Sequence, residues 1–282
     1  MPTRKLIFVD TNIWLDFYRA RSEAGLKLLD HLEKISGDLI SSYQLEMEFK
    51  KNRQAAIMEG FQVLKSPDNI SRPGIFSDAK AVKIIQDNIK AVSSRVNTLK
   101  RKLKDVVENP GTHDPVFKAF HRILENKSPL HLTRKDTFRN SIRRRAFRRF
   151  LHGCPPRKIN DTSFGDAFNW EWMIDCAIKH KAELVIVSRD ADYGMVFDGT
   201  AYINDHLKQE FSERVGKRKK IQLYTRLSDA LKHFKIPVTE AETLEEDIII
   251  TSELVEPSIK PSIELILLRK LLEGYSQQDK NP

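Results

Sequence analysis

The stretch that decides the fold is KLIFVD at residues 5–10, followed without a break by TNIWLDFYRA at residues 11–20. An apolar, β-branched run of this kind is typical of a buried strand, and apolar residues then recur at helical spacing. Three later runs have the same strand character and alternate with helical patterns: GDLISS at 37–42, ELVIVS at 183–188 and KIQLYT at 220–225. Strands that alternate with helices predict an α/β fold, a doubly wound parallel sheet with helices on both faces.

A long helical stretch interrupts this alternation. Its apolar residues are separated by three and four residues in turn, which predicts a projecting helix that packs against another helix and also permits a homodimer. This heptad seam consists of Val82, Ile85, Ile89, Val92, Val96, Leu99, Leu103 and Val106. Pro110, Gly111 and Pro115 end the pattern, and two more helices are predicted before residue 154. In the second of them, apolar Phe138, Ile142, Phe147 and Leu151 leave most of the surface to arginine.

We therefore expect a discontinuous α/β core at residues 1–64 and 155–236, with an inserted basic, all-helical lobe at 65–154. An acidic C-terminal tail at 237–282 follows the core. From Val238 onward the tail has ten acidic and four basic residues, and one helix, IELILLRKLLEGY at 263–275, is predicted in it. Prolines break the tail, so we expect it to be loosely attached.

Composition excludes several classes of protein. With 40% hydrophobic and 31% charged residues among 282, no run approaches the roughly 18 apolar residues of a membrane span. The opening MPTRKLIFVD lacks a secretory apolar region, so we expect cytoplasmic residence and no membrane partner. Cys154 and Cys176 are too few, and too unlike ligand spacings, for a disulfide framework or a zinc site.

Positive charge is concentrated in one part of the chain. The formal net charge is +9, yet residues 100–158 alone hold 17 Lys and Arg against five Asp and Glu. Such a patch favours an anionic partner, and nucleic acid is the one we expect. Docking on the acidic tail is the competing interpretation. The candidate phosphate-binding residues are Arg143, Arg144, Arg145, Arg148, Arg149, Arg157 and Lys158.

Acidic residues follow two of the predicted strands. Asp10 ends KLIFVD, and Asp190 and Asp192 follow ELVIVS. Ligands of parallel α/β sheets bind beyond the carboxyl ends of the strands, so these acids are expected to lie near one another. Asp166, in the first turn of the helix that begins at GDAFNWE, is expected to join them. A lone acid at such a position also has a simpler role, as a helix cap or a first-turn acid that favours the helix dipole.

A fourth carboxylate comes from QLEMEFKKNR at residues 44–53. Glu46 and Glu48 compete for this role, and Glu48 is preferred because Leu45 and Phe49 mark the buried face beside it. Four carboxylates in one cleft repel one another, and an all-oxygen ligand set favours one or two Mg²⁺ or Mn²⁺ ions. Such a site suits phosphodiester hydrolysis, and the basic patch would hold the polyanion.

These motifs resemble those of the PIN-domain nucleases. The resemblance is carried by FVDTNIWLDF, LEMEFKKNR, GDAFNWE and VSRDADYG, and the basic insertion with its PPRK resembles that of larger bacterial PIN-like proteins. It implies a doubly wound fold and metal-dependent cleavage, mostly of RNA and often by toxins with an antitoxin partner. The chain is longer than the compact toxins. The implied ligands are Asp10, Glu48, Asp166 and Asp190, with Asp192 as an accessory acid and Thr11, Asn12 and Ser188 as polar groups behind them.

Other functions stay open at this point. A nucleic-acid-binding module could hold the metal without turnover, and a nuclease of the same fold could cleave DNA. A phosphatase of the haloacid-dehalogenase kind also begins with an Asp after an apolar strand, but it needs a second acid two residues on, where this chain has Asn12.

Overall fold

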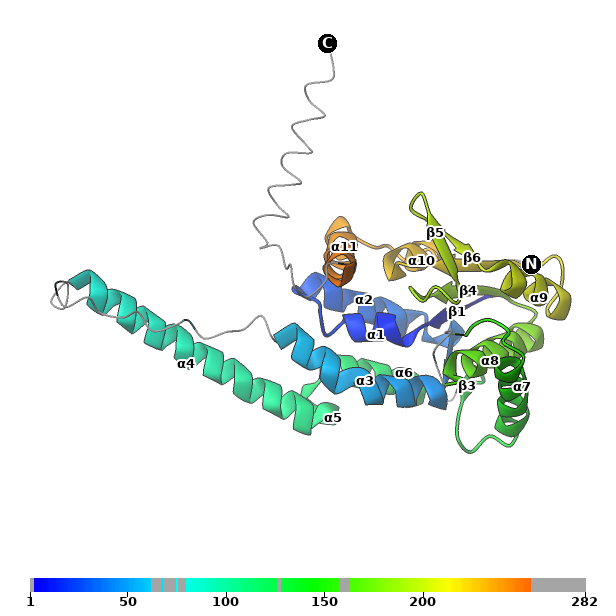
Figure 1. Ribbon diagram of the computed structural model, residues 1–282, viewed down its shortest axis with the longest axis horizontal. Coiled ribbons are helices and arrows are strands. Elements are labelled where there is room, and N and C mark those ends of the chain that lie inside the picture. Colours follow the sequence, from blue (N-terminus) through cyan, green and yellow to red (C-terminus); the bar gives the residue numbers. More distant parts are fainter. Residues whose placement is uncertain are drawn as a thin grey trace, which may run out of the picture.

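A computed structural model of the chain describes residues 3–61, 80–125, 128–157 and 163–254, with the single positions 67 and 75. Its centre is a sheet of five parallel strands in the order β3-β2-β1-β4-β7 (Figure 1). The five strands are β1 (Lys5–Val9), β2 (Leu39–Ser42), β3 (His131–Leu132), β4 (Glu183–Val187) and β7 (Ile221–Tyr224). A separate antiparallel hairpin consists of β5 (Gly194–Phe197) and β6 (Thr200–Ile203). The predicted α/β fold with a parallel sheet is confirmed.

Helices connect the strands. They are α1 (Thr11–Asp16), α2 (Glu23–Lys34), the 3₁₀ turn η1 (Ser36–Asp38), α3 (Tyr43–Phe61), α4 (Lys80–Glu108), α5 (Pro110–His113), α6 (Pro115–Glu125), α7 (Arg139–Leu151), α8 (Gly165–His180), α9 (Asp205–Arg214), α10 (Leu227–His233) and α11 (Glu240–Leu254). The chain moves in one direction from β1 to β2 and β3, and in the other from β1 to β4 and β7. Right-handed crossovers therefore put α2 and α6 on one face of the sheet and α8 and α9 on the other. The contacts between helices agree with this, because α2 packs against α6 and α8 packs against α9.

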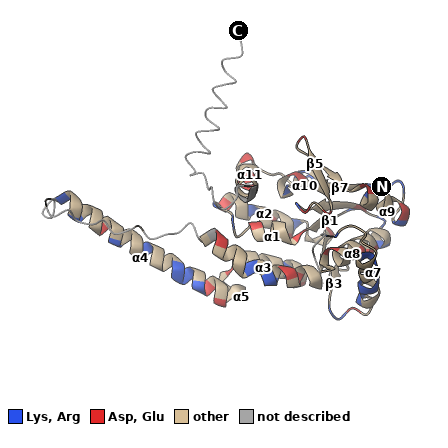
Figure 2. Cartoon of the chain, in the orientation of Figure 1, with Lys and Arg blue, Asp and Glu red and all other residues tan. Residues whose placement is uncertain are grey.

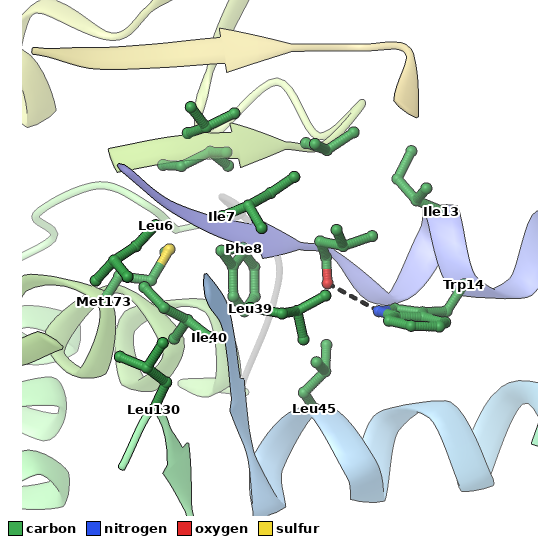
Figure 3. Packing of buried hydrophobic residues seen from close by; sticks show 14 of the residues in the cluster. Leu6, Ile7, Phe8, Ile13, Trp14, Leu39, Ile40, Leu45, Leu130 and Met173 are labelled. Atoms are coloured by element: carbon green, nitrogen blue, oxygen red, sulfur yellow. Dashed lines mark hydrogen bonds between the residues drawn. The ribbon is translucent and has the colours of Figure 1, made fainter. Parts of the chain in front are cut away.

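The core is built on β1 and β4, which pair in register from Lys5 opposite Glu183 to Val9 opposite Val187. Both strands are buried on both faces, which explains why their sequences are continuous apolar runs rather than alternating ones. Leu6 and Phe8 lie toward Ile40 and Met173 (Figure 3). The indole of Trp14 donates a hydrogen bond of 3.1 Å to the carbonyl of Val9, which fixes α1 against the end of β1.

Much of the region between the two halves of the core belongs to the same packed unit. The strand β3, which the sequence analysis did not predict, pairs with β2 at the sheet edge. Phe120 of α6 is stacked on Phe49 of α3, with ring centroids 4.1 Å apart. The part that extends away from the core is α4 (Figure 1). It covers the predicted 82–106 helix and ends before Pro110, as the sequence analysis expected.

The buried face of α7 differs from the predicted one. Ile142, Ala146 and Arg149 are buried at i, i+4 and i+7, whereas Phe147 and Leu151 are exposed. The prediction was wrong because it placed every arginine outside, although the arginine at position 149 meets carboxylates of α8 and α9. Buried charge is compatible with a packed face when each charged group finds an opposite one.

The described part of the acidic tail is firmly attached. Glu245 accepts hydrogen bonds from the backbone of Arg21 and Ser22 before α2, and Glu246 accepts them from Leu227 and Ser228 at the start of α10. Two glutamates of α11 thus satisfy the open N–H groups at the beginnings of two other helices. The expected loose attachment is wrong for 240–254, and the predicted helix 263–275 lies outside the described residues. No helix in the described ranges has the length and apolar character needed to span a bilayer.

Candidate active site

A pocket of about 300 Å³ opens at the carboxyl edge of the sheet, where β1, β2 and β4 end. All four acids predicted as ligands line it, although they come from four separate segments of the chain. Its lining residues are Asp10, Thr11, Asn12, Leu15, Gln44, Met47, Glu48, Lys51, Asn52, Ser163, Asp166 and Asp190. Asp192 is not among them.

Asp10 is held by its backbone and by two hydrogen bonds to its carboxylate. Its N–H donates to the carbonyl of Val187 in β4, so the residue extends the β1–β4 pairing by one position. One carboxylate oxygen accepts from the N–H of Thr11 at 2.7 Å, and the other accepts from the hydroxyl of Ser188 at 2.6 Å. Asp10 is also the N-cap of α1. It therefore has the capping role considered in the sequence analysis and lies in the pocket as well.

Ser188 connects the two strand-end acids. Its hydroxyl donates to Asp10 and accepts from the N–H of Asp190 at 3.1 Å. One side chain therefore sets the position of the Asp10 carboxylate relative to the backbone that carries Asp190. The resemblance to PIN domains implied that Ser188 is a polar group behind the ligands. Its hydrogen bonds to Asp10 and Asp190 are consistent with that role.

Glu48 is oriented by a second pair of contacts. Thr11 Oγ1 donates to one carboxylate oxygen at 3.2 Å, and Gln44 Nε2 donates to the other at 2.7 Å. Glu46 instead forms an ion pair of 2.5 Å with Lys50 and does not line the pocket. The geometry therefore favours Glu48, the acid preferred from the sequence.

Asp166 reaches the pocket because α8 begins there. The backbone of Gly165 lies against Glu48, and a Cβ added at this glycine would collide with the Glu48 carboxylate and come within 2.8 Å of Gln44 Nε2. Only glycine allows this approach. The hydroxyl of Ser42 accepts from the N–H of Leu45 and donates to Asn169 Oδ1 at 2.8 Å, which ties the start of α3 to α8.

The acids influence one another electrostatically. Burial raises the pKa of Asp10 from 3.8 to about 6, and the charges of Asp190 and Glu48 add to this against the hydrogen bonds from Ser188 and Thr11. Tyr193 is fully buried beside the same group, and its hydroxyl has no hydrogen-bond partner among the described residues. Burial, followed by the charges of Asp166, Asp10, Glu48 and Asp190, raises the pKa of Tyr193 well above its usual range.

Several pocket residues were missed by the sequence analysis. These are Gln44, Lys51 and Asn52, which lie on one face of α3 with the predicted Glu48, and this polar stripe could have been found by its helical period. Tyr193 gave no such signal, because a tyrosine after a strand is more often a packing residue.

The seven predicted phosphate-binding residues fall into three groups. Arg143, Arg144 and Arg148 are exposed on α7, and the Arg143 guanidinium lies over the ring of Phe164, just before Asp166. Arg145 and Arg149 instead form ion pairs with Glu171, so we correct their assignment to the packing of α7 on α8. The guanidinium of Arg157 lies over the Phe150 ring, and Lys158 is outside the described residues.

The residues that line the pocket fit a cation that keeps some of its water ligands better than a fully dehydrated one. Within the described ranges, no three Asp, Glu, His or Cys side chains form a ready-made cage for an ion. The pocket nevertheless supplies only oxygen ligands from its acids, and the charges of Asp190 and Glu48 add to the effect of burial in raising the pKa of Asp10. Mg²⁺ usually keeps several waters and binds through one or two carboxylates, so such a pocket suits it.

The fold and the pocket together define a class of protein: α/β proteins with an acidic pocket at the carboxyl edge of a parallel sheet. A family model described as PIN domain matches residues 7–193. The chain therefore belongs to the PIN-domain family, whose members are generally nucleases that use divalent metals. Searches of curated proteins and of solved structures found no match.

Proposed function

We propose that the protein is a metal-dependent endoribonuclease, with Asp10, Glu48, Asp166 and Asp190 holding one or two Mg²⁺ or Mn²⁺ ions. The observation that carries the proposal is the meeting of these four acids, from four separate segments, in one pocket. The two buried hydroxyls of Thr11 and Ser188 add weight to it, because each orients a carboxylate that faces the pocket. A packing role for the acids alone gives no reason for that arrangement.

The chemistry divides between the ion and the chain. A bound divalent ion would supply a more acidic water at neutral pH and a counter-charge for the scissile phosphate. Asp10 and Asp190 would bind it from the strand ends, with Ser188 keeping their relative position. Glu48 and Asp166 would complete the site from the two helices that Ser42 ties together. Lys51, exposed at the pocket, would contact a phosphate that the acids alone repel.

Positive charge beyond the pocket supports a polyanionic substrate. Lys and Arg residues are concentrated along α7 and at the end of α4 that is nearer the core (Figure 2). Arg143 lies over Phe164, two residues before the pocket acid Asp166, so the arginines of α7 lead toward the site. Non-specific binding to nucleic acid comes mainly from such phosphate contacts.

The test is cleavage of labelled single-stranded RNA, transfer RNA and DNA by the purified protein with Mn²⁺ or Mg²⁺. We expect cleavage of RNA that stops when a chelator removes the ion and returns when Mn²⁺ is restored. Cleavage of DNA alone would replace the proposal with a deoxyribonuclease. Binding of RNA without any cleavage would favour the alternative of a binding module that holds metal without turnover.

The exposed arginines of α7 give a second prediction. Replacing Arg143, Arg144 and Arg148 together with alanine should weaken RNA binding and reduce the slope of log affinity against log salt by about 0.7 for each phosphate that the protein no longer neutralises. Thermal stability should change little, because these side chains are exposed. Affinity measured by fluorescence anisotropy over a range of salt concentrations checks this. An unchanged slope would place the substrate on another surface.

A further inference from the structure

The heptad seam of α4 is only partly covered by the elements that the structure describes, among them Arg53 of α3, which donates a hydrogen bond to the carbonyl of Val106. Its d positions Ile85, Val92 and Leu99 are 43%, 45% and 39% exposed, whereas Val96 at an a position is 6% exposed. Among the elements that the structure describes, only the four-residue α5 has more than marginal contact with α4. The helix is 29 residues, roughly 43 Å, and projects from the core (Figure 1). Long amphipathic helices bury such a stripe against another helix.

We propose that α4 pairs with α4 of a second copy of this chain in an antiparallel coiled coil. The spacing of three and four residues persists through eight positions, which is the repeat of a two-stranded left-handed supercoil. A partner must then present a seam of the same length and repeat. The other helices of the described part are shorter, at 19 residues or fewer, so a second α4 is the matching element.

The seam is self-complementary in the antiparallel direction. The order of residue types along the seam is Val, Ile, Ile, Val, Val, Leu, Leu, Val, so the pattern of small and large side chains is the same from either end. Antiparallel pairing gives the layers Val82 with Val106, Ile85 with Leu103, Ile89 with Leu99, and Val92 with Val96. Each layer then combines side chains of similar volume, and a parallel dimer would fill its layers equally well. Packing therefore favours self-pairing without deciding its direction.

Charge decides the direction. In a parallel pair, Arg95 at a g position would face Lys100 at an e position of the other copy, and symmetry repeats this repulsion. In the antiparallel pair, Lys100 and Lys102 would face the neutral Gln86 and Asn88 of the other copy, and Arg95 would be the one charged residue at the e and g positions that meets its own mate. The basic residues from Lys100 to Lys104 would also lie at opposite ends, each set beside its own core.

The first test is the mass of the full-length protein in solution by sedimentation velocity, over about 1 to 100 µM. We expect a concentration-dependent species of twice the 32.7 kDa chain mass. Val92→Glu with Leu99→Glu should weaken the dimer at least about 100-fold, because charges would enter its apolar seam. The matched control, Ala91→Glu with Ser94→Glu, adds the same charge at exposed positions away from the seam and should still dimerise. A wild-type monomer at every concentration, or equal effects of both variants, would overturn the proposal.

The second test fixes the direction by disulfide formation, in a Cys154→Ser background that leaves only the buried Cys176. Ser93→Cys should cross-link two copies under mild oxidation, since this e position meets its own mate only in the antiparallel pair. Ile85→Cys should not, because it would face Leu103 of the other copy. The reverse result would establish a parallel dimer and overturn the antiparallel assignment.

Discussion

Asp10→Asn is expected to abolish cleavage, with a loss of at least about 1,000-fold in rate, while the protein keeps its fold. The amide can reproduce both contacts of the carboxylate: its oxygen can accept from the N–H of Thr11, and its NH₂ can donate to the oxygen of Ser188. Only the negative charge that would bind the ion is removed. Cleavage of labelled RNA in Mn²⁺, measured beside circular dichroism of the same sample, checks both parts.

The same substitution should stabilise the metal-free protein at neutral pH. The pKa of Asp10 is about 6 in the folded chain against 3.8 ordinarily, so the folded state holds the extra proton between these values. Wild-type stability therefore falls as the pH rises from about 4 to about 6, a penalty of about 3 kcal/mol above that window. The variant lacks this penalty, and thermal melts with chelator at pH 4.5 and 7 measure the difference.

The matched control is Glu46→Gln, a carboxylate-to-amide change on α3 outside the pocket. It should cleave RNA at close to the wild-type rate, and its free energy of unfolding should lie within about 1 kcal/mol of the wild-type value, because the Glu46–Lys50 pair is partly exposed. Full activity in Asp10→Asn would refute the metal-binding role of the strand-end acids. Equal losses in both variants would point to a general effect of charge rather than to this pocket.

Glu171→Ala should be among the most destabilising single changes in the chain, at about 3 to 5 kcal/mol. The Glu171 side chain is 4% exposed and binds three arginines: Arg145 at 2.9 Å, Arg214 at 2.8 Å and Arg149 at 3.3 Å. Burial alone would raise the pKa of Glu171, but these partners, Arg214 foremost, lower it. Alanine would leave the buried Arg149 with Glu210 as its one carboxylate partner among the described residues, and Arg214 shares that carboxylate.

A melting temperature lower by on the order of 10 °C is the expected readout, since 1 kcal/mol shifts a protein of this size by roughly 2–4 °C. Asp175→Asn is the control, because its ion pair with the same Arg145 is partly exposed and should contribute at most about 1 kcal/mol. Comparable shifts in the two variants would show that the network around Glu171 is no more than a set of surface pairs.

The sequence predicted much of the site for a specific reason. Asp10 and Asp190 follow apolar runs, and parallel strands bring their carboxyl ends to one edge, so two distant acids could be placed together from pattern alone. Glu48 was preferred over Glu46 from the buried faces of Leu45 and Phe49, and the pocket agrees. The contact of Gly165 with Glu48 could not be predicted, because it depends on how α8 meets α3.

The arginines of α7 mark the limit of such reasoning. All five were given to nucleic acid because no acid stands near them in the sequence, yet Arg145 and Arg149 meet Glu171 and Glu210 from α8 and α9. Charge counted along the chain says nothing of partners that arrive from other helices. The three exposed arginines keep the prediction, and the two that pair with Glu171 support the fold.

The sequence by itself determined the alternation of strands and helices, the length of α4, and the acids at the strand ends. Each of these follows from local periodicity, or from the rule that parallel strands end at one edge. The tertiary structure alone decided which charges face the solvent and which are buried in pairs. It also decided which oxygen of each acid is held by Thr11, Ser188 or Gln44. These depend on distances between segments far apart in the chain, and no local pattern encodes them.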